Sequence, residues 1–255
     1  MKAIRLPQTI AVINRRGGVG KTATAHALGS GLIQRGFKVL FVDLDSQSNL
    51  TFDLGTKPQA LTSMEVLTGT ATAEETIQHT AGGDIIPASP SLAGADATID
   101  GTGKEYRLKE ALEKVKGYDY IIIDTPPALG VLTVNALTSS TLAVIPAQAE
   151  IHSLQGIGLL NETIEAVKRY TNPKLKIAGI LITRYNGRAI LSKQMRDSLE
   201  ERARELKTKV FNTPIRECIA IKEAQALQTD IFTYAPKSNA VEDYNALIEE
   251  IIKER

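Results

Sequence analysis

The chain has 255 residues, of which 43% are hydrophobic and 23% are charged, and its formal net charge is +1. This composition is ordinary for a globular protein and one α/β domain can reach this length, so we expect a single domain over residues 1–255, with no overall charge that selects nucleic acid or membranes. The single cysteine, Cys218, excludes an internal disulfide and a CxxC metal clip, and no apolar run approaches the ~18 residues of a membrane span.

Apolar, β-branched runs alternate with helical patterns along the chain. The runs predict strands at residues 9–14, 39–43, 120–124, 142–146 and 177–183, and the patterns between and after them predict helices at 21–34, 106–116, 153–170, 189–206 and 239–254. Thr62 and Glu65 have the spacing of a capping box that opens a further short helix, and residues 68–80 have no clear assignment. Because the strand runs are continuously apolar, they predict burial on both faces. The sequence therefore predicts an α/β fold, a doubly wound and mostly parallel sheet flanked by helices.

The strongest motif, GGVGKT at residues 17–22, lies between an expected strand and an expected helix, as a phosphate-binding loop requires. Its glycines let main-chain N–H groups turn toward phosphate oxygens, and the following helix adds the positive end of its dipole. In such a loop Lys21 contacts the β- and γ-phosphates and the Thr22 hydroxyl ligates Mg²⁺. The sequence thus predicts a P-loop NTPase, although Arg15 occupies the first glycine position of the strict pattern GxxxxGK[ST]. The expected nucleotide-binding residues are Gly17, Gly18, Val19, Gly20, Lys21, Thr22 and Ala23.

Three carboxylates come at the ends of two expected strands. Asp43 and Asp45 lie on the same side of an extended chain because side chains alternate along it, and a plain strand-end cap is the structural alternative for this pair. Asp124 follows the apolar run at 120–123. Ligands of open α/β sheets bind at the carboxyl ends of the strands, where a carboxylate suits Mg²⁺ held through water. Asp124 is therefore expected beside the metal.

These motifs resemble those of the ParA/MinD superfamily of deviant Walker A ATPases, and within it the ParA/Soj partition ATPases. GGVGKT resembles the family pattern KGGxGK[ST], residues 43–49 (DLDSQSN) resemble DxDPQxN, and residues 124–127 (DTPP) resemble a switch segment. The resemblance implies that ATP and Mg²⁺ are the cofactors, that Asp45 orients the attacking water and that Asp43 supports the Mg²⁺ hydration shell. Arg16 occupies the position of a signature lysine that reaches the phosphates of the partner subunit in an ATP-bound dimer. The implied catalytic residues are Lys21, Asp45 and Arg16.

Two further segments extend the resemblance over most of the chain. Residues 145–156 (IPAQAEIHSLQG) are similar to a family segment near the dimer interface, which makes Gln148 and Glu150 interface candidates together with Arg16. Residues 234–238 (YAPKS) resemble a turn that lies near the adenine in the family, which makes Pro236 a candidate base contact.

The segment from Arg184 to Lys222 carries ten Lys/Arg and five Asp/Glu residues. A local basic excess attracts phosphate backbones, and a solvated helix face explains it equally well. In the family an arginine shortly after the fifth expected strand contacts DNA, and Arg188 is the matching residue. A second family arginine aligns with Ala220, so that contact is either lost or moved to Arg216 or Lys222.

The resemblance implies a weak, partner-stimulated ATPase that forms a homodimer with ATP and binds double-stranded DNA non-specifically. With a ParB-like centromere-binding partner it would segregate a chromosome, plasmid or mobile element, in the cytoplasm and on the nucleoid. Three glutamates in residues 245–255 disfavour membrane binding. The alternatives are a MinD-like positioning or replication-regulating ATPase and a metabolic ATP-dependent ligase of related fold. The motif at 43–49 and the segment with Gln148 and Glu150 disfavour the ligase.

Overall fold

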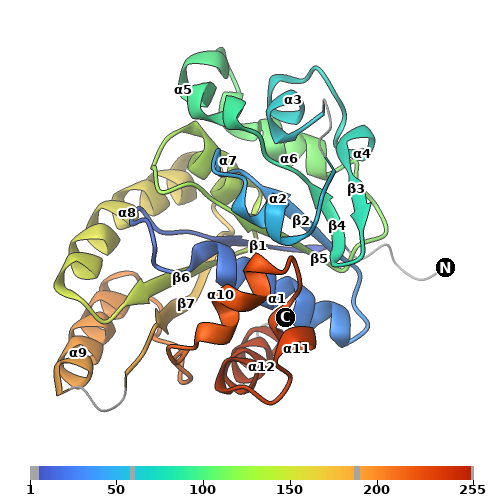
Figure 1. The fold of residues 1–255 in the computed structure, drawn as a ribbon. Helices are drawn as coiled ribbons and strands as arrows, with labels where there is room; N and C mark the ends of the chain where they lie inside the picture. The colour runs from blue at the N-terminus through green and yellow to red at the C-terminus, as the bar shows by residue number, and fades with distance from the viewer. Residues whose placement is uncertain (1–5, 58–60, 187–189, 254–255) are drawn as a thin grey trace.

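The central feature of the fold is a seven-stranded sheet with helices on both faces (Figure 1). The computed structural model describes residues 6–57, 61–186 and 190–253, with the backbone alone described at 151–155 and 190–194. All neighbouring strands are parallel except the edge pair of β3 and β4. In spatial order the strands are β3 (Gln78–Thr80), β4 (Gly83–Ile86), β2 (Val39–Asp43), β5 (Tyr120–Asp124), β1 (Gln8–Val12), β6 (Leu142–Gln148) and β7 (Lys176–Thr183).

Helices cover the two faces in separate groups, so the predicted doubly wound α/β fold is confirmed. One apolar core joins the sheet to α3, α6, α7, α8 and α9, and the other joins it to α1, α10, α11 and α12. The helices are α1 (Lys21–Gln34), α2 (Asn49–Asp53), α3 (Ser63–Thr68), α4 (Ala73–Thr76), α5 (Ala95–Thr98), α6 (Arg107–Leu112), α7 (Val131–Ser139), α8 (Ile151–Tyr170), α9 (Ile190–Glu205), α10 (Ile219–Ala226), α11 (Ile231–Tyr234) and α12 (Asn239–Ile252), with 3₁₀ turns η1 (Pro90–Gly94) and η2 (Lys104–Tyr106).

The strand register brings the motif-bearing ends of three strands to one edge of the sheet. β5 lies between β1 and β2, and Asp124 is paired with Val12 on one side and with Asp43 on the other. Because parallel strands end at the same edge, the loop after β1 and the acidic segments after β2 and β5 emerge together there.

Several elements differ from the sequence-based expectation. The sequence patterns do not predict β3, β4, α7 or α10, and β6 continues to Gln148 beyond the expected end at residue 146. The helix expected at 106–116 is wrong in its bounds, since a 3₁₀ turn precedes α6 and α6 ends at Leu112. The expected capping box is confirmed, because the Thr62 side chain accepts from a main-chain N–H of α3 and Glu65 accepts from the N–H of Thr62.

The apolar side of α12 is packed into the core. Tyr244, Leu247, Ile248 and Ile251 are buried, and Ile248 lies so close to Gly31 of α1 that a β-carbon at that glycine would overlap it. Glycine in α1 therefore lets the two helices approach closely. None of the helices in the described part of the chain is long and apolar enough to cross a bilayer.

Candidate functional site

The loop between β1 and α1 has the conformation of a phosphate cradle. Gly18 and Gly20 have φ angles of 74° and 87°, a left-handed conformation that glycine adopts without steric cost. A β-carbon added at Gly17 or Gly18 would meet no atom within 4 Å, so one side of the loop is open for a ligand. The helix α1 begins at Lys21 directly after the loop, which directs its free N–H groups into the same space.

Side chains from β6, from β7 and from the segment after β1 hold this loop in place. The Gln148 amide donates to the carbonyl of Gly18 at 2.9 Å, and the Thr183 hydroxyl donates to the carbonyl of Val19 at 2.8 Å. Asn14, directly after β1, donates to a carbonyl of β6 at 2.7 Å. Gln148 was expected at a dimer interface, and within this chain it supports the loop through the carbonyl of Gly18. Asn14 and Thr183 were not expected from the motifs.

Lys21, Thr22 and Asp124 lie together at the floor of the loop. The Thr22 hydroxyl donates to Asp124 Oδ2 at 2.6 Å, and the Lys21 ammonium donates to the carbonyl of Arg16 at 3.1 Å. Burial raises the pKa of Asp124 well above its usual value, and the charge of Asp43 adds to the effect. Burial lowers the pKa of Lys21, against the opposing charges of Asp124 and Asp45. Lys21 and Asp124 are thus buried opposite charges that influence each other's pKa, and the half-buried Thr22 is hydrogen-bonded to Asp124.

Asp43 is a hydrogen-bond hub rather than an exposed carboxylate. Its Oδ2 accepts from the N–H and the hydroxyl of Thr51, at 2.9 and 2.7 Å, and its Oδ1 accepts from the N–H of Asp45 at 3.0 Å. Burial raises its pKa to about 6, and these three hydrogen bonds oppose the shift. The Thr51 hydroxyl also accepts from the N–H of Ala88 at 2.8 Å. Asp43 therefore shapes the turn that carries Asp45.

Asp45 itself lies at the wall of the cleft above the loop. Its Oδ1 accepts from the N–H of Gln47 at 3.0 Å, and its side chain is almost buried, with 8% of the residue exposed. A carboxylate in this position, beside the phosphate loop, can accept a hydrogen bond from a water molecule in the cleft.

Arg16 and Glu150 form an ion pair at the edge of the loop. Arg16 Nη2 lies 2.6 Å from Glu150 Oε2, and the two side chains are 31% and 49% exposed. The Arg16 main-chain N–H is fixed by Asn14 Oδ1 at 2.9 Å. Both residues were expected at a dimer interface, and the structure brings them together within one chain.

A cleft of about 440 Å³ runs from the phosphate loop to α10. Its far end is walled by the segment at 215–218, by α10 and by Tyr244 of α12. Pro236, the expected base contact, lies in the turn before α12 and does not line this cleft. The residues that do line its far end include Ile215, Cys218, Ile221, Lys222, Gln225 and Tyr244.

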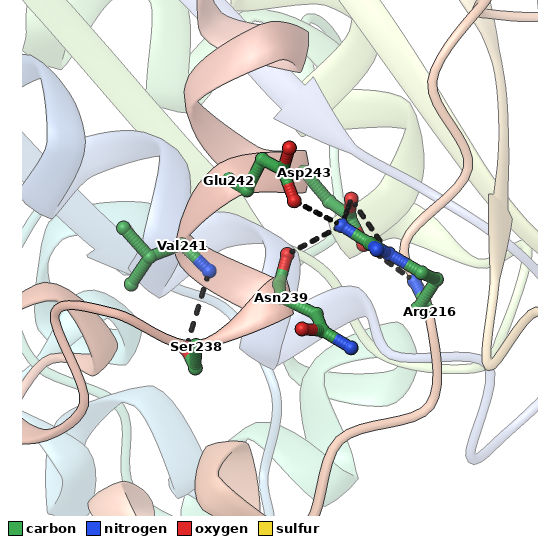
Figure 2. Close-up of polar contacts among 6 residues, drawn as sticks. All are labelled: Arg216, Ser238, Asn239, Val241, Glu242 and Asp243. Carbon is green, nitrogen blue, oxygen red and sulfur yellow. Dashed lines mark hydrogen bonds and ion pairs between the residues drawn. The ribbon is translucent and has the colours of Figure 1, made fainter.

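The expected DNA contacts have different surroundings. Arg188 lies outside the described residues. Lys222 is exposed on α10 at the rim of the cleft. Arg216 is held by two acids of α12, with Nη2 at 2.6 Å from Asp243 Oδ1 and at 2.6 Å from Glu242 Oε2 (Figure 2).

This clasp also involves the backbone of Arg216, whose N–H donates to Asp243 Oδ2 at 2.9 Å. The hydrogen bonds to Asp243 and Glu242 raise the pKa of the Arg216 guanidinium. Arg216 thus ties the segment at 215–218, a wall of the cleft, to the first turn of α12, and its charge is balanced by two carboxylates.

The described residues fit a nucleoside triphosphate with Mg²⁺. The cradle at Gly17 and Gly18 is open, and Asp124 Oδ1 is buried without a hydrogen-bond donor among the described residues. An oxygen of this kind suits a water of the Mg²⁺ shell. Magnesium usually keeps several waters and takes one or two protein oxygens in addition to phosphates, which matches a set made of the Thr22 hydroxyl and the Asp124 carboxylate.

Comparison with known proteins identifies the family. Residues 7–177 match a family described as the AAA domain. The chain is 40% identical over 248 residues to the sporulation initiation inhibitor protein Soj of Bacillus subtilis, covering 95% of this chain and 97% of that protein. It is 38% identical over 247 residues to the chromosome-partitioning ATPase Soj of Thermus thermophilus, covering 95% and 94%.

Solved structures agree in fold over nearly the whole chain. Cobyrinic acid a,c-diamide synthase from Mycobacterium smegmatis, with bound ADP and magnesium, has a TM-score of 0.84 and 35% identity, covering 98% of this chain and 95% of that chain. An ATP complex of Cyanothece McdA has a TM-score of 0.85 and 25% identity, covering 96% of each. A plasmid partition protein from Borrelia burgdorferi has a TM-score of 0.75 and 26% identity, covering 98% and 100%. With its phosphate loop, its acidic strand ends and these relatives, the chain belongs to the ParA/Soj family of P-loop ATPases.

Proposed function

We propose that this ATPase is a partition switch, in which ATP binding favours a DNA-bound homodimer and hydrolysis returns the protein to the free monomer. The observation that carries the proposal is the meeting of the phosphate loop, Asp124 and the Asp43–Asp45 turn at one sheet edge. The full-length similarity to Soj proteins supports it further. The cargo would be a chromosome, a plasmid or a mobile element.

In the proposed hydrolysis, each residue of the site has a separate task. The loop N–H groups and Lys21 hold the phosphates and balance their charge. Thr22 and Asp124 hold Mg²⁺ and its waters, and the metal supplies charge neutralisation on the phosphate oxygens. Asp45 orients the attacking water, and Asp43 fixes the turn that positions Asp45.

In the proposed dimer, Arg16 takes the place of the family's signature lysine. Its side chain is partly exposed at the edge of the loop, and Nη1 is buried without a hydrogen-bond partner in the described part of the chain. Arginine keeps the positive charge and offers a planar fork for phosphate. Arg16 would therefore act on the nucleotide of a second subunit, with Gln148 and Glu150 near the contact.

We place the DNA surface of the dimer on the basic segment that includes Arg188 and Lys222. Lys222 is exposed on a helix that lines the nucleotide cleft, so a phosphate contact there is close to the site that ATP occupies. Arg216 would contribute only if its clasp with Asp243 and Glu242 opened. Each phosphate contact is weak alone, and a dimer doubles the number, which makes affinity depend on ATP. A ParB-like DNA-binding protein would stimulate hydrolysis, and the complex would lie on the nucleoid in the cytoplasm.

The test is DNA co-sedimentation with ATP, with ADP and without nucleotide. We expect ATP-dependent binding to any double-stranded sequence, with log K falling by about 0.9 per neutralised phosphate per log unit of salt. Lys21→Ala should abolish it, and charge reversal at Arg188 together with Lys222 should abolish it without loss of ATP binding. ATP-dependent DNA binding that survives the double reversal would remove the basic segment from the proposal.

A second candidate, a metabolic ATP-dependent amide-forming enzyme, is favoured by one observation, the 35% identity to the protein described as cobyrinic acid a,c-diamide synthase. The two candidates differ in what stimulates ATP turnover. A partition switch responds to DNA with its protein partner, and an amide-forming enzyme responds to a carboxylate substrate with an ammonia donor. ATP turnover that rises with a corrinoid carboxylate and ammonia, and does not change with DNA, would favour the synthase.

A further inference from the structure

The end of the cleft away from the phosphate loop contains a glutamine side chain, Gln225, whose amide is held by a buried carboxylate. Gln225 of α10 lines the cleft, and its Nε2 donates to Asp53 Oδ2 at 2.7 Å. Asp53 is the last residue of α2 and is only 4% exposed. The pair thus joins α10, a wall of the cleft, to the helix that follows the Asp43–Asp45 turn.

The chemistry of the pair decides which end of the amide is available. An ionised carboxylate only accepts hydrogen bonds, so the NH₂ end of Gln225 must face Asp53. Burial raises the pKa of Asp53 to about 6, so the carboxyl is mainly ionised at pH 7.5. The neighbouring His26 Nδ1 is 3.8 Å from the same oxygen, and burial lowers the pKa of His26 to about 4. A neutral histidine does not compete strongly for the carboxylate.

The oxygen of the Gln225 amide, Oε1, is then available to accept a hydrogen bond from a ligand in the cleft. Within the described ranges no donor is hydrogen-bonded to Gln225 Oε1. The same cleft is lined by the apolar side chains of Ile215 and Ile221 and by Tyr244, which can pack on the planar faces of a purine. A nucleotide with its phosphates on residues 17–22 extends its base toward this end, because the cleft is continuous from the loop to α10.

We infer that Gln225, oriented by Asp53, is a specificity-determining residue that selects adenine through its 6-amino group. The amino group donates to Gln225 Oε1, and a 6-oxo purine presents an acceptor to the same oxygen. This inference rests on the proposed function, because it takes ATP as the nucleotide of the site. Its consequence is a preference that depends on the purine 6-position and not on the phosphates.

The experiment measures equilibrium binding of ATP and of inosine triphosphate, which carries a 6-oxo group, with Mg²⁺ at pH 7.5. A neutral hydrogen bond is worth roughly 2- to 12-fold in affinity, so we expect wild type to favour ATP by about 10-fold. Gln225→Leu should weaken ATP and bring the two affinities within about 2-fold. Asp53→Asn can present either its acceptor or its donor end to Gln225, so the orientation of the Gln225 amide is no longer fixed and the preference for ATP over inosine triphosphate should shrink.

A matched control is available on the same segment. Gln228 Nε2 also donates to α2, to the carbonyl of Phe52 at 3.0 Å, but Gln228 does not line the cleft. Gln228→Ala should leave the ratio of the two affinities unchanged. The inference is overturned if Gln225→Leu and Asp53→Asn weaken both nucleotides equally, which would make the pair a structural tie only. Failure of the proposed function looks different, because DNA co-sedimentation would then not depend on ATP while wild type still favoured ATP over inosine triphosphate.

Discussion

Thr51 offers a sharp test of how the acidic turn is built. Its hydroxyl donates to Asp43 Oδ2 at 2.7 Å and accepts from the N–H of Ala88 at 2.8 Å. Thr51→Val keeps the shape of the side chain and removes both hydrogen bonds. The remaining main-chain bond from residue 51 to Asp43 stays, so the variant isolates the hydroxyl.

The expected magnitude follows from the two lost contacts. A hydrogen bond to a charged group contributes about 1.5–3 kcal/mol, and a buried N–H left without a partner costs about 1–3 kcal/mol. These terms overlap, so we expect a total loss of ~3 kcal/mol in the free energy of unfolding. For a chain of this size that corresponds to a fall in Tm of roughly 6–12 °C. Hydrolysis should also slow, because Asp43 accepts from the N–H of Asp45 and fixes its position.

The assay is thermal unfolding together with ATP turnover and ATP affinity. Thr56→Val is the matched control, since the Thr56 hydroxyl donates to the carbonyl of Thr51 at 3.0 Å and does not touch Asp43. We expect the control to lose ~1 kcal/mol or less and to keep its turnover. Equal Tm and turnover in the Thr51→Val variant and wild type would refute the role assigned to the Asp43 hub.

Four further changes test other parts of the site. Lys21→Ala should abolish ATP binding or hydrolysis, and unchanged affinity and turnover would remove the phosphate loop assignment. Asp45→Ala should slow hydrolysis and leave an ATP-bound dimer in size-exclusion chromatography, whereas a wild-type rate would exclude Asp45 as the water-orienting group. Arg16→Ala should weaken ATP-dependent dimerisation and hydrolysis but not the ATP affinity of the monomer, and Arg16→Lys should restore both; lost monomer affinity would show that Arg16 acts within its own subunit. Burial lowers the pKa of His26 to about 4 and raises that of Asp53 to about 6. Between pH 6.5 and 4 the unfolded chain binds a proton at His26 more readily than the folded chain, so acidification lowers the free energy of unfolding through His26. The folded chain binds a proton at Asp53 more readily than the unfolded chain, so acidification raises the free energy of unfolding through Asp53. Asp53→Asn removes the stabilisation that Asp53 gains on acidification, so the free energy of unfolding of the variant should fall relative to wild type by up to ~3 kcal/mol over that range. A Tm difference between the two proteins that does not change with pH would contradict this expectation.

The central strands could be predicted from the sequence because they are continuous runs of apolar residues. β2 and β5 each consist of five consecutive buried residues, a short run that is typical of a strand covered on both faces. β3 has three residues and is partly exposed, and β4 begins at a glycine, so neither has a periodicity to read. The assignment of β4 depends on its pairing with β2, which is a tertiary contact, and β3 in turn pairs with β4.

The missed helix α7 shows a different limit. Its sequence, VLTVNALTS, is rich in β-branched residues, which favour strands. Tertiary contacts decide the outcome, because Asn135 in this helix is buried and accepts from the N–H of Leu108 at 3.0 Å and donates to the carbonyl of Lys104 at 2.9 Å. Local propensity cannot contain these partners, which lie about 30 residues earlier in the chain.

The residues of the site likewise include some that the sequence could predict and some that depend on tertiary contacts. Lys21, Thr22 and Asp124 could be placed together from the sequence, because each follows a buried strand and parallel strands end at one edge. The supports from Gln148 and Thr183 could not be foreseen, since they depend on β6 and β7 being the next strands beyond β1. The pairing of Gln225 with Asp53 likewise joins residues 172 positions apart.

The position of β1 in the sheet has a consequence for the order of events during synthesis. β1 is made first, yet its two neighbours are β5 and β6, and the side chain that supports the loop at Gly18 is that of Gln148. At about 5–20 residues per second, the ribosome makes the stretch from Val12 to Gln148 in roughly 7–27 s. For most of that interval, until β5 is made, β1 has neither of its neighbouring strands, and the Gln148 side chain is missing throughout. A nascent chain released before β6 emerges should therefore be unable to bind ATP, and the apolar residues of β1 must stay protected from aggregation until then.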